Sequence, residues 1–101
     1  MMEIFETAPA DLDLPPVLDL TAASGLLEAF LERRGQVLSV DGSNVQRLGA
    51  QCLQVLLAAR MAWEEDGQTL CVENCSEDFL ASLELMGVTP ETLTYRKELA
   101  S

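Results

Sequence analysis

Histidine is absent from this 101-residue chain, and basic residues are scarce. Without imidazole there can be no Ser-His or Cys-His nucleophile pair and no imidazole base, and the commonest metal ligand is missing. Six lysines and arginines stand against 17 aspartates and glutamates, which gives a formal net charge of −11. Nucleic acids and anionic membranes attract clustered positive charge, so this balance argues against both as partners. A negatively charged protein is attracted more readily to a basic patch on another protein.

Cysteine occurs only three times, an odd number that does not make a disulfide framework. Cys71 and Cys75 are four residues apart, so the Cys-x-x-Cys spacing of zinc and redox sites is missing. Cys52 falls on the apolar face of a predicted helix and is interpreted as a core residue. The thiols are therefore expected to be structural and reduced, as in the cytoplasm, and we expect no metal, no cofactor and no enzymatic activity.

No apolar run approaches the roughly 18 residues that a membrane-spanning helix requires. The N-terminal sequence MMEIFETAPADLDLP is acidic and lacks the basic and then apolar regions of a secretory signal. Apolar residues make up 49% of the chain, which is typical of a globular protein and too many for disorder. We therefore expect one domain over residues 1–101, without membrane insertion.

The longest apolar-rich stretch runs from Val45 to Trp63 and contains no proline. Its apolar residues recur at intervals of three and four, which predicts a long amphipathic helix packed against a core. A second apolar row, formed by Leu53, Leu57 and Met61, lies beside the first. A helix that is apolar over more than half of its circumference is deeply buried or covered by a partner.

The rest of the chain alternates between short strand patterns and helix patterns, which implies right-handed crossovers and a mainly parallel sheet. Two further helices are predicted, one capped by Thr21 and one by Ser76. Asp11–Pro16, with its double proline, suits a sheet edge or a connection. Strands are predicted at Ile4–Thr7, Pro16–Leu20, Gln36–Asp41, Gln68–Glu73 and Thr92–Tyr95.

Apolar and polar residues alternate within the predicted strands, whereas parallel strands covered on both faces are apolar throughout. In Gln36–Asp41, Leu38 and Val40 would face the helices, and Ser39 and Asp41 would face away. We therefore predict an α/β fold: a wound β-α superhelix with helices on one face of a mainly parallel sheet of four to five strands.

The segment Asp41–Leu57, DGSNVQRLGAQCLQVLL, and the order of the elements together resemble the STAS domain, the fold of anti-sigma-factor antagonists. Those proteins carry Asp-x-Ser-x-Val, two residues, an apolar residue, and then Asp-Ser-(Ser/Thr)-Gly-Leu entering a long helix. Asp41, Ser43, Val45 and Leu48 keep the first half of this pattern. The resemblance covers nearly the whole chain.

The second half of the pattern differs. Gly49 and Ala50 stand where the family has its aspartate and its phosphorylatable serine or threonine, and Gln51 and Cys52 follow. In the antagonists, a partner kinase phosphorylates that hydroxyl at the helix N-terminus, and the added charge breaks binding. Ala50 has no oxygen to accept a phosphoryl group, so the resemblance implies a STAS protein that binds without being switched at this position.

The variant LGAQCLQVLL, together with LPPVLDL and GQTLCVENCSEDF, is most similar to small STAS proteins found with bacterial chemotaxis genes. This narrower resemblance implies a regulatory protein whose partner is a signalling histidine kinase or an ATPase-type kinase. A turn of small residues lets another backbone approach, and neighbouring side chains offer apolar contact and hydrogen bonds. The predicted partner-binding residues are Ser43, Asn44, Gly49, Ala50, Gln51, Leu53, Gln54 and Leu57.

Other interpretations of the same residues stay open. The small residues could serve only to let the helix pack closely on the sheet. Small STAS domains are also accessory subunits of lipid-transporting ABC transporters. An anti-sigma-factor antagonist could instead be switched by phosphorylation at Ser43. A homodimer through the open sheet face or the second apolar row is also compatible with the sequence.

Overall fold

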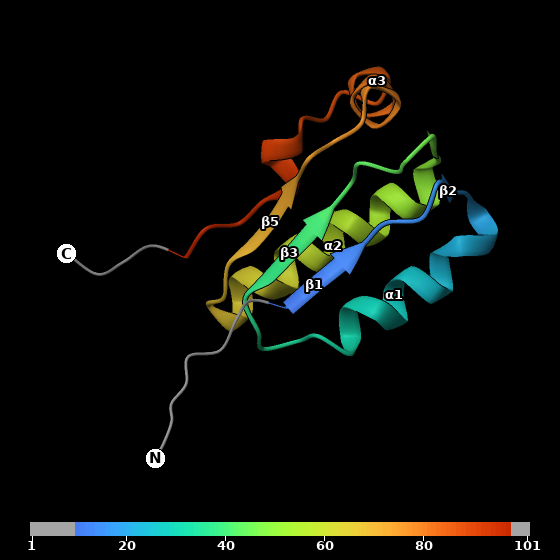
Figure 1. Cartoon of the computed structure of the whole chain (residues 1–101). Coiled ribbons are helices and arrows are strands. Elements are labelled where there is room, and N and C mark those ends of the chain that lie inside the picture. Colours follow the sequence, from blue (N-terminus) through green and yellow to red (C-terminus); the bar gives the residue numbers. More distant parts are fainter. Residues whose placement is uncertain (1–9, 98–101) are drawn as a thin grey trace, which may run out of the picture.

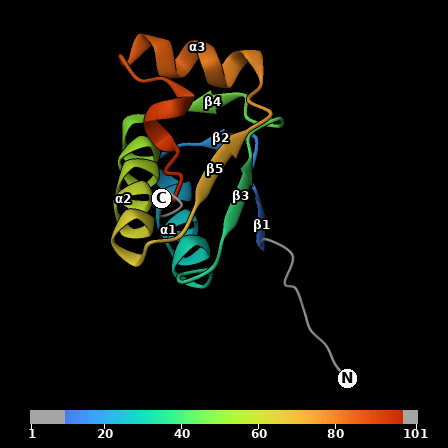
Figure 2. The same ribbon diagram turned by 90° about the vertical axis from the view of Figure 1, so that its left-hand side faces the viewer.

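A three-stranded parallel sheet lies at the centre of the computed structural model, which describes residues 10–97. Its strand order is β1 (Ala10–Asp13), β3 (Leu38–Asp41), β5 (Leu70–Glu73). Helices α1 (Ala23–Leu31) and α2 (Ala50–Asp66) cover one face of the sheet (Figure 1). Helix α3 (Glu77–Leu85) crosses the end at which the strands finish (Figure 2). The predicted α/β class, parallel sheet and one-sided helices are confirmed.

A second sheet of two short parallel strands lies near α3, where β2 (Val17–Leu18) pairs with β4 (Arg47–Leu48) (Figure 2). The five strands of residues 10–97 are thus divided between two sheets, and do not form the one sheet of four to five strands that we predicted. Two 3₁₀ helices complete the fold. They are η1 (Leu20–Ala22) and η2 (Pro90–Leu93).

The strand predictions hold for the middle of the chain and fail at Thr92–Tyr95. Asp11–Pro16 supplies the edge strand β1 and a connection, as expected, but the strand predicted at Pro16–Leu20 joins only the small sheet. The strand predicted at Thr92–Tyr95 is wrong, because η2 occupies its first half and only a single antiparallel bridge joins Tyr95 to Leu70. The strand predicted at Ile4–Thr7 lies outside the described residues.

Helix α2 begins at Ala50 and not at Val45, so the sequence prediction of its start is wrong. The backbone N–H groups ahead of it are already paired with the β2 segment. Two of them donate to the Pro16 carbonyl, and the N–H of Gly49 donates to the Leu18 carbonyl at 2.8 Å. Because these donors are fixed by a neighbouring strand, helical hydrogen bonding starts only after Gly49.

Side chains cap the starts of η1 and α3, but only one of these caps was predicted. The carboxylate of Asp19 accepts the N–H of Thr21 at 3.1 Å and its hydroxyl at 2.7 Å, so Asp19 caps η1 and the predicted Thr21 cap is wrong. Ser76 caps α3 as predicted, because its hydroxyl oxygen accepts the N–H of Phe79 at 3.0 Å.

The core lies between the sheet and helices α1 and α2. The Trp63 side chain is 0% exposed and meets the ring of Phe30 edge-on, with centroids 6.0 Å apart. Its Nε1–H donates to the Gln36 carbonyl at 2.6 Å, so the indole is satisfied within the core. As predicted, strand residues alternate between the two faces: Leu38, Val40, Leu70 and Val72 are buried, while Ser39, Asp41, Cys71 and Glu73 stay accessible.

Gly42 is required by packing at the end of β3. A Cβ atom there would lie 2.5 Å from the Phe79 ring, whereas a Cβ at Gly25 in α1 would meet nothing within 4 Å. Gly42→Ala should therefore lower the free energy of unfolding by about 1–3 kcal/mol. The matched control Gly25→Ala should raise it by roughly 0.5–1 kcal/mol. Urea unfolding followed by Trp63 fluorescence measures both, and equal effects would contradict this packing.

Candidate functional site

The first turn of α2 is held firmly against β2 and η1. Gly49 precedes the helix in an extended conformation, and no side chain caps the helix end. A Cβ at Gly49 would lie 3.6 Å from the Leu18 carbonyl oxygen, so the two segments are close. The Cys52 thiol donates to the Asp19 carbonyl at 3.2 Å. These contacts fix the position of Ala50, which is exposed at the start of the helix.

The structure brings most of the predicted partner-binding residues to the surface at this end of the molecule. Gly49 and Leu57 are half-buried. Leu53 is only 8% exposed and belongs to the core, so the predicted second apolar row is shorter than expected. The five that are exposed are Ser43, Asn44, Ala50, Gln51 and Gln54.

Ser43 and Asn44 lie in a turn that is tied to the segment before α3. One carboxylate oxygen of Asp41 accepts the N–H of Ser43 at 2.8 Å, and the other accepts the side-chain amide of Asn74 at 3.2 Å. The N–H of Ser76 donates to the Gly42 carbonyl at 3.1 Å. This turn is therefore on the α3 side of β4, whereas Ala50 is on the η1 side.

Three exposed residues beside the start of α2 were missed by the sequence analysis. Leu20 is 70% exposed and Val17 is 39% exposed. Arg47 is the register partner of Val17, is exposed, and forms no ion pair with any other residue of the described range. The apolar strand pattern of Pro16–Leu20 indicated burial, so no signal in the sequence marked Leu20 as a surface residue.

The outward face of α2 carries no charge over its first three turns. Its exposed residues from Ala50 to Ala58 are neutral, and so is Met61, which is 61% exposed; Arg60 is half-buried and paired with Glu64. In a protein with a net charge of −11 this is the kind of surface that costs least to desolvate, as at the centre of an interface. The residues of this neutral face are Ala50, Gln51, Gln54, Ala58 and Met61.

Two of the three thiols are held in the protonated form. Burial, more than any nearby charge, raises the pKa of Cys52 and of Cys75, so both stay protonated at neutral pH. Within residues 10–97, no three histidine, cysteine, aspartate or glutamate side chains are grouped in a way that could hold a metal ion.

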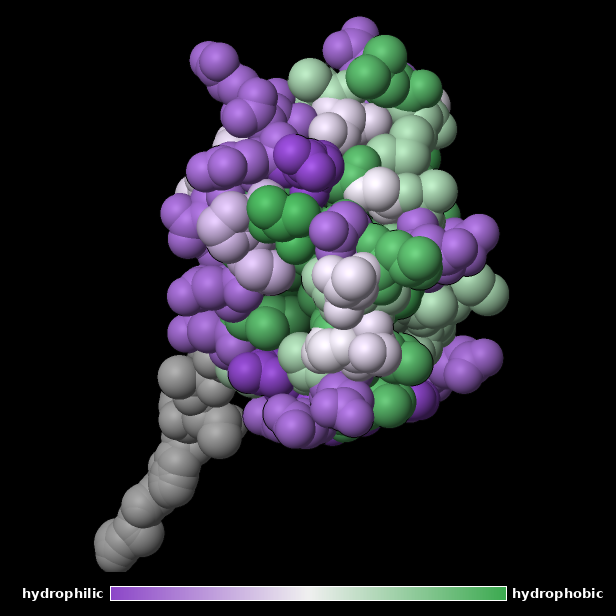
Figure 3. Space-filling model, turned by 90° about the vertical axis from the view of Figure 1, so that its right-hand side faces the viewer, coloured by the Kyte–Doolittle hydropathy of each residue, from purple (hydrophilic) through white to green (hydrophobic). Residues whose placement is uncertain are grey.

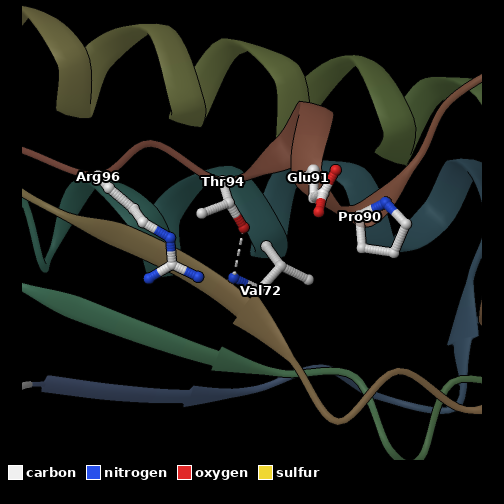
Figure 4. Close-up of a pocket in the computed structure, with 5 residues that line it drawn as sticks. All are labelled: Val72, Pro90, Glu91, Thr94 and Arg96. Carbon is white, nitrogen blue, oxygen red and sulfur yellow. Dashed lines mark hydrogen bonds between the residues drawn. The ribbon is translucent and has the colours of Figure 1, made fainter.

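A hollow of about 300 Å³ lies beside β5, and Figure 4 shows the five residues that line it. The hydroxyl oxygen of Thr94 accepts the N–H of Val72 at 3.1 Å, which satisfies a donor at the sheet edge. No predicted partner-binding residue lines this hollow. Thr94 therefore closes part of the sheet edge, and the hollow is separate from the predicted partner-binding residues.

Fold and site together define a class of protein: a small α/β domain with a parallel sheet, helices on one face and an exposed helix start. The family model described as "Mlab, STAS domain" matches residues 3–94, and the chain therefore belongs to the STAS family. No curated protein matches the chain. STAS domains are in general binding and regulatory domains that mediate protein–protein interaction. None of the helices in residues 10–97 is both long and apolar enough to cross a membrane.

The turn that carries Ser43 should make stability depend on pH. Hydrogen bonds from Ser43 and then Asn74 hold the pKa of Asp41 below its usual value in the folded state. A lowered folded-state pKa stabilises the fold above the unfolded-state pKa of about 4, and the contribution is lost as pH falls through the folded value. Asp41→Asn should therefore reduce the loss of stability below about pH 4.

Urea unfolding at a series of acidic pH values measures this difference. Asp13→Asn is the matched control, because Asp13 is exposed on the same sheet face and its carboxylate accepts no side-chain or backbone hydrogen bond within residues 10–97. The pKa of Asp19 and of Asp66 are also lowered, by Thr21 and by Arg34, so some pH dependence should persist. The same acid sensitivity in Asp41→Asn as in the unsubstituted protein would contradict this role.

Proposed function

We propose that this STAS protein is a non-catalytic regulator in bacterial signal transduction, which binds a chemotaxis histidine kinase or a related ATPase-type kinase in the cytoplasm. The observation that carries the proposal is the exposed start of α2, where Ala50 stands in the place of the family's phosphorylatable residue. Ala50 has no hydroxyl, so binding through this surface is not switched by phosphorylation at that position.

The chemistry of the surface supports docking of a protein. Leu20 and Val17 supply exposed apolar area, and Gln51 and Gln54 supply amide donors and acceptors. No side chain caps the helix, so its first backbone N–H groups are available to acceptors on a partner. Arg47 adds a cation beside the apolar pair, and arginine is among the residues most often central to interface affinity.

Regulation of such a complex must act elsewhere than at residue 50. A STAS protein with serine at the helix start can be phosphorylated there and then released by its partner. A protein with alanine at this position keeps the same affinity, because no phosphate can be added to it. The occupancy of the complex is then set by the amount of this protein and by the conformational state of the kinase.

A permanent subunit of a lipid-transporting ABC transporter is the second candidate function. The absence of a hydroxyl at Ala50 favours it too, because a subunit that stays bound needs no switch. Affinity purification of the tagged chain from its own cells separates the candidates. Recovery of a histidine kinase supports regulation of signalling, and recovery of an ATP-binding transporter subunit supports the transporter.

A switch at Ser43 is the third candidate. Its side chain is exposed, but the Asp41 carboxylate accepts its N–H at 2.8 Å, so an added phosphate would meet a negative charge. Mass spectrometry after incubation with the purified kinase and ATP decides the matter, because a phosphate on Ser43 would establish the switch.

Substitution of Ala50 by glutamate tests the proposed surface. Burying an unpaired carboxylate in the interface should cost about 3 kcal/mol, roughly a 100-fold rise in Kd. A carboxylate in the first turn of a helix is favourable for folding, so Ala50→Glu should keep its structure. Titration calorimetry with the proposed partner kinase measures the change.

Ala81→Glu is the matched control, since Ala81 is an exposed alanine on α3 and the substitution changes the net charge by the same amount. It should bind like the unsubstituted protein. Equal affinities of the Ala50→Glu and Ala81→Glu variants would refute the proposed surface.

A further inference from the structure

A second apolar surface lies between α1 and α2, on the face that Figure 3 presents. Apolar side chains are spread over the middle of this face among weakly polar ones, and hydrophilic side chains lie mostly along its left and lower margins (Figure 3). A groove of about 190 Å³ is found there. Leu27 and Leu31 of α1 form one wall and are 45% and 54% exposed. Alanines of α2 form the opposite wall, and their small side chains leave the groove open.

The groove is rigid at its floor and closed at one end. Its floor is the edge-on pair of Phe30 and Trp63, which are 3% and 0% exposed. At that end, the guanidinium of Arg34 makes two hydrogen bonds to the Asp66 carboxylate, at 2.7 and 3.0 Å, and so links the turn after α1 to the last residue of α2. A preformed groove binds with little cost of ordering.

The charges around the groove select its occupant. The cation that lines it, Arg34, is already paired with Asp66. Glu28 of α1 and Glu65 of α2 are exposed beside the walls, and neither forms an ion pair within residues 10–97. The rim is therefore negative. It repels anionic lipid and also a second copy of this chain, which would bring the same acidic rim.

We infer that the α1–α2 groove binds an amphipathic helix of a partner protein that carries lysine or arginine beside its apolar stripe. The nine residues of α1 extend about 14 Å, which matches about two and a half turns of a bound helix. Leucine-sized anchors at intervals of three and four fill such a groove, and basic residues on either side meet Glu28 and Glu65. This inference goes beyond the proposed function, because it does not depend on the kinase or on the start of α2.

Binding of synthetic peptides to the full chain tests the inference. The probe is a labelled helical peptide of about four turns, with leucines along one stripe and lysines on both sides of it. Its counterpart carries glutamate in place of every lysine. Fluorescence anisotropy should show binding of the lysine peptide only, and the affinity should fall as salt rises from about 0.05 to about 0.5 M.

Two substitutions locate the binding. Ala58→Leu fills the groove at an exposed position of α2, where leucine is a good helix former, and should weaken the lysine peptide about tenfold or more. Glu28→Lys should also weaken it. The matched controls on α3 are Ala81→Leu and Glu84→Lys, which should bind normally. Ala50→Glu should also leave peptide binding unchanged, which separates this test from that of the proposed function.

Three results would overturn the inference. One is equal binding of the lysine and glutamate peptides, and another is equal affinity of Ala58→Leu and Ala81→Leu for the lysine peptide. The third is a dimer in sedimentation equilibrium that Ala58→Leu dissociates, because a second copy would then occupy the groove.

Discussion

The parallel pairing of β2 with β4 fixes the start of α2, and the exposed surface around Ala50 depends on this pairing. Each strand has only two residues, yet their hydrogen bonds hold Gly49 against the Leu18 carbonyl at 2.8 Å. Without that contact, the helix could begin earlier, and Ala50 would become an interior helix position. With it, Ala50 becomes the first residue of an uncapped helix beside the exposed Leu20. A short non-local pairing therefore decides which residues a partner can reach.

Charge is distributed so that one face stays in water while others can be covered. On the open sheet face, Asp13, Asp41 and Glu73 are neighbours across three strands. Like charges in adjacent strands repel, and hydrogen bonds from Asn74 to Asp41 and from Ser39 to Glu73 offset part of that repulsion. Removing such a row from water would be costly. The neutral outward face of α2 carries no such cost.

Local patterns predicted much of this fold, and non-local contacts account for what they missed. Alternation in Gln36–Asp41 gave the correct strand and its correct inward face, and Ser76 gave the correct start of α3. The start of α2 was placed too early, because periodicity continues through Val45 while the β2 pairing is invisible to it. Periodicity also could not tell that Leu53 faces the core while Leu20 faces solvent. The family resemblance predicted the partner-binding residues, and the structure shows which of them are exposed.

Hydrogen–deuterium exchange of the free protein and of its complex with the kinase tests the central claim most directly, because it reports which backbone segments a partner covers. The account predicts slower exchange on binding at residues 17–21 and in the first two turns of α2, with exchange in α3 unchanged. It also predicts the same protection before and after incubation with ATP, since Ala50 cannot be phosphorylated. Protection confined to α3 or to the open face of the sheet, or protection that ATP abolishes, would contradict it.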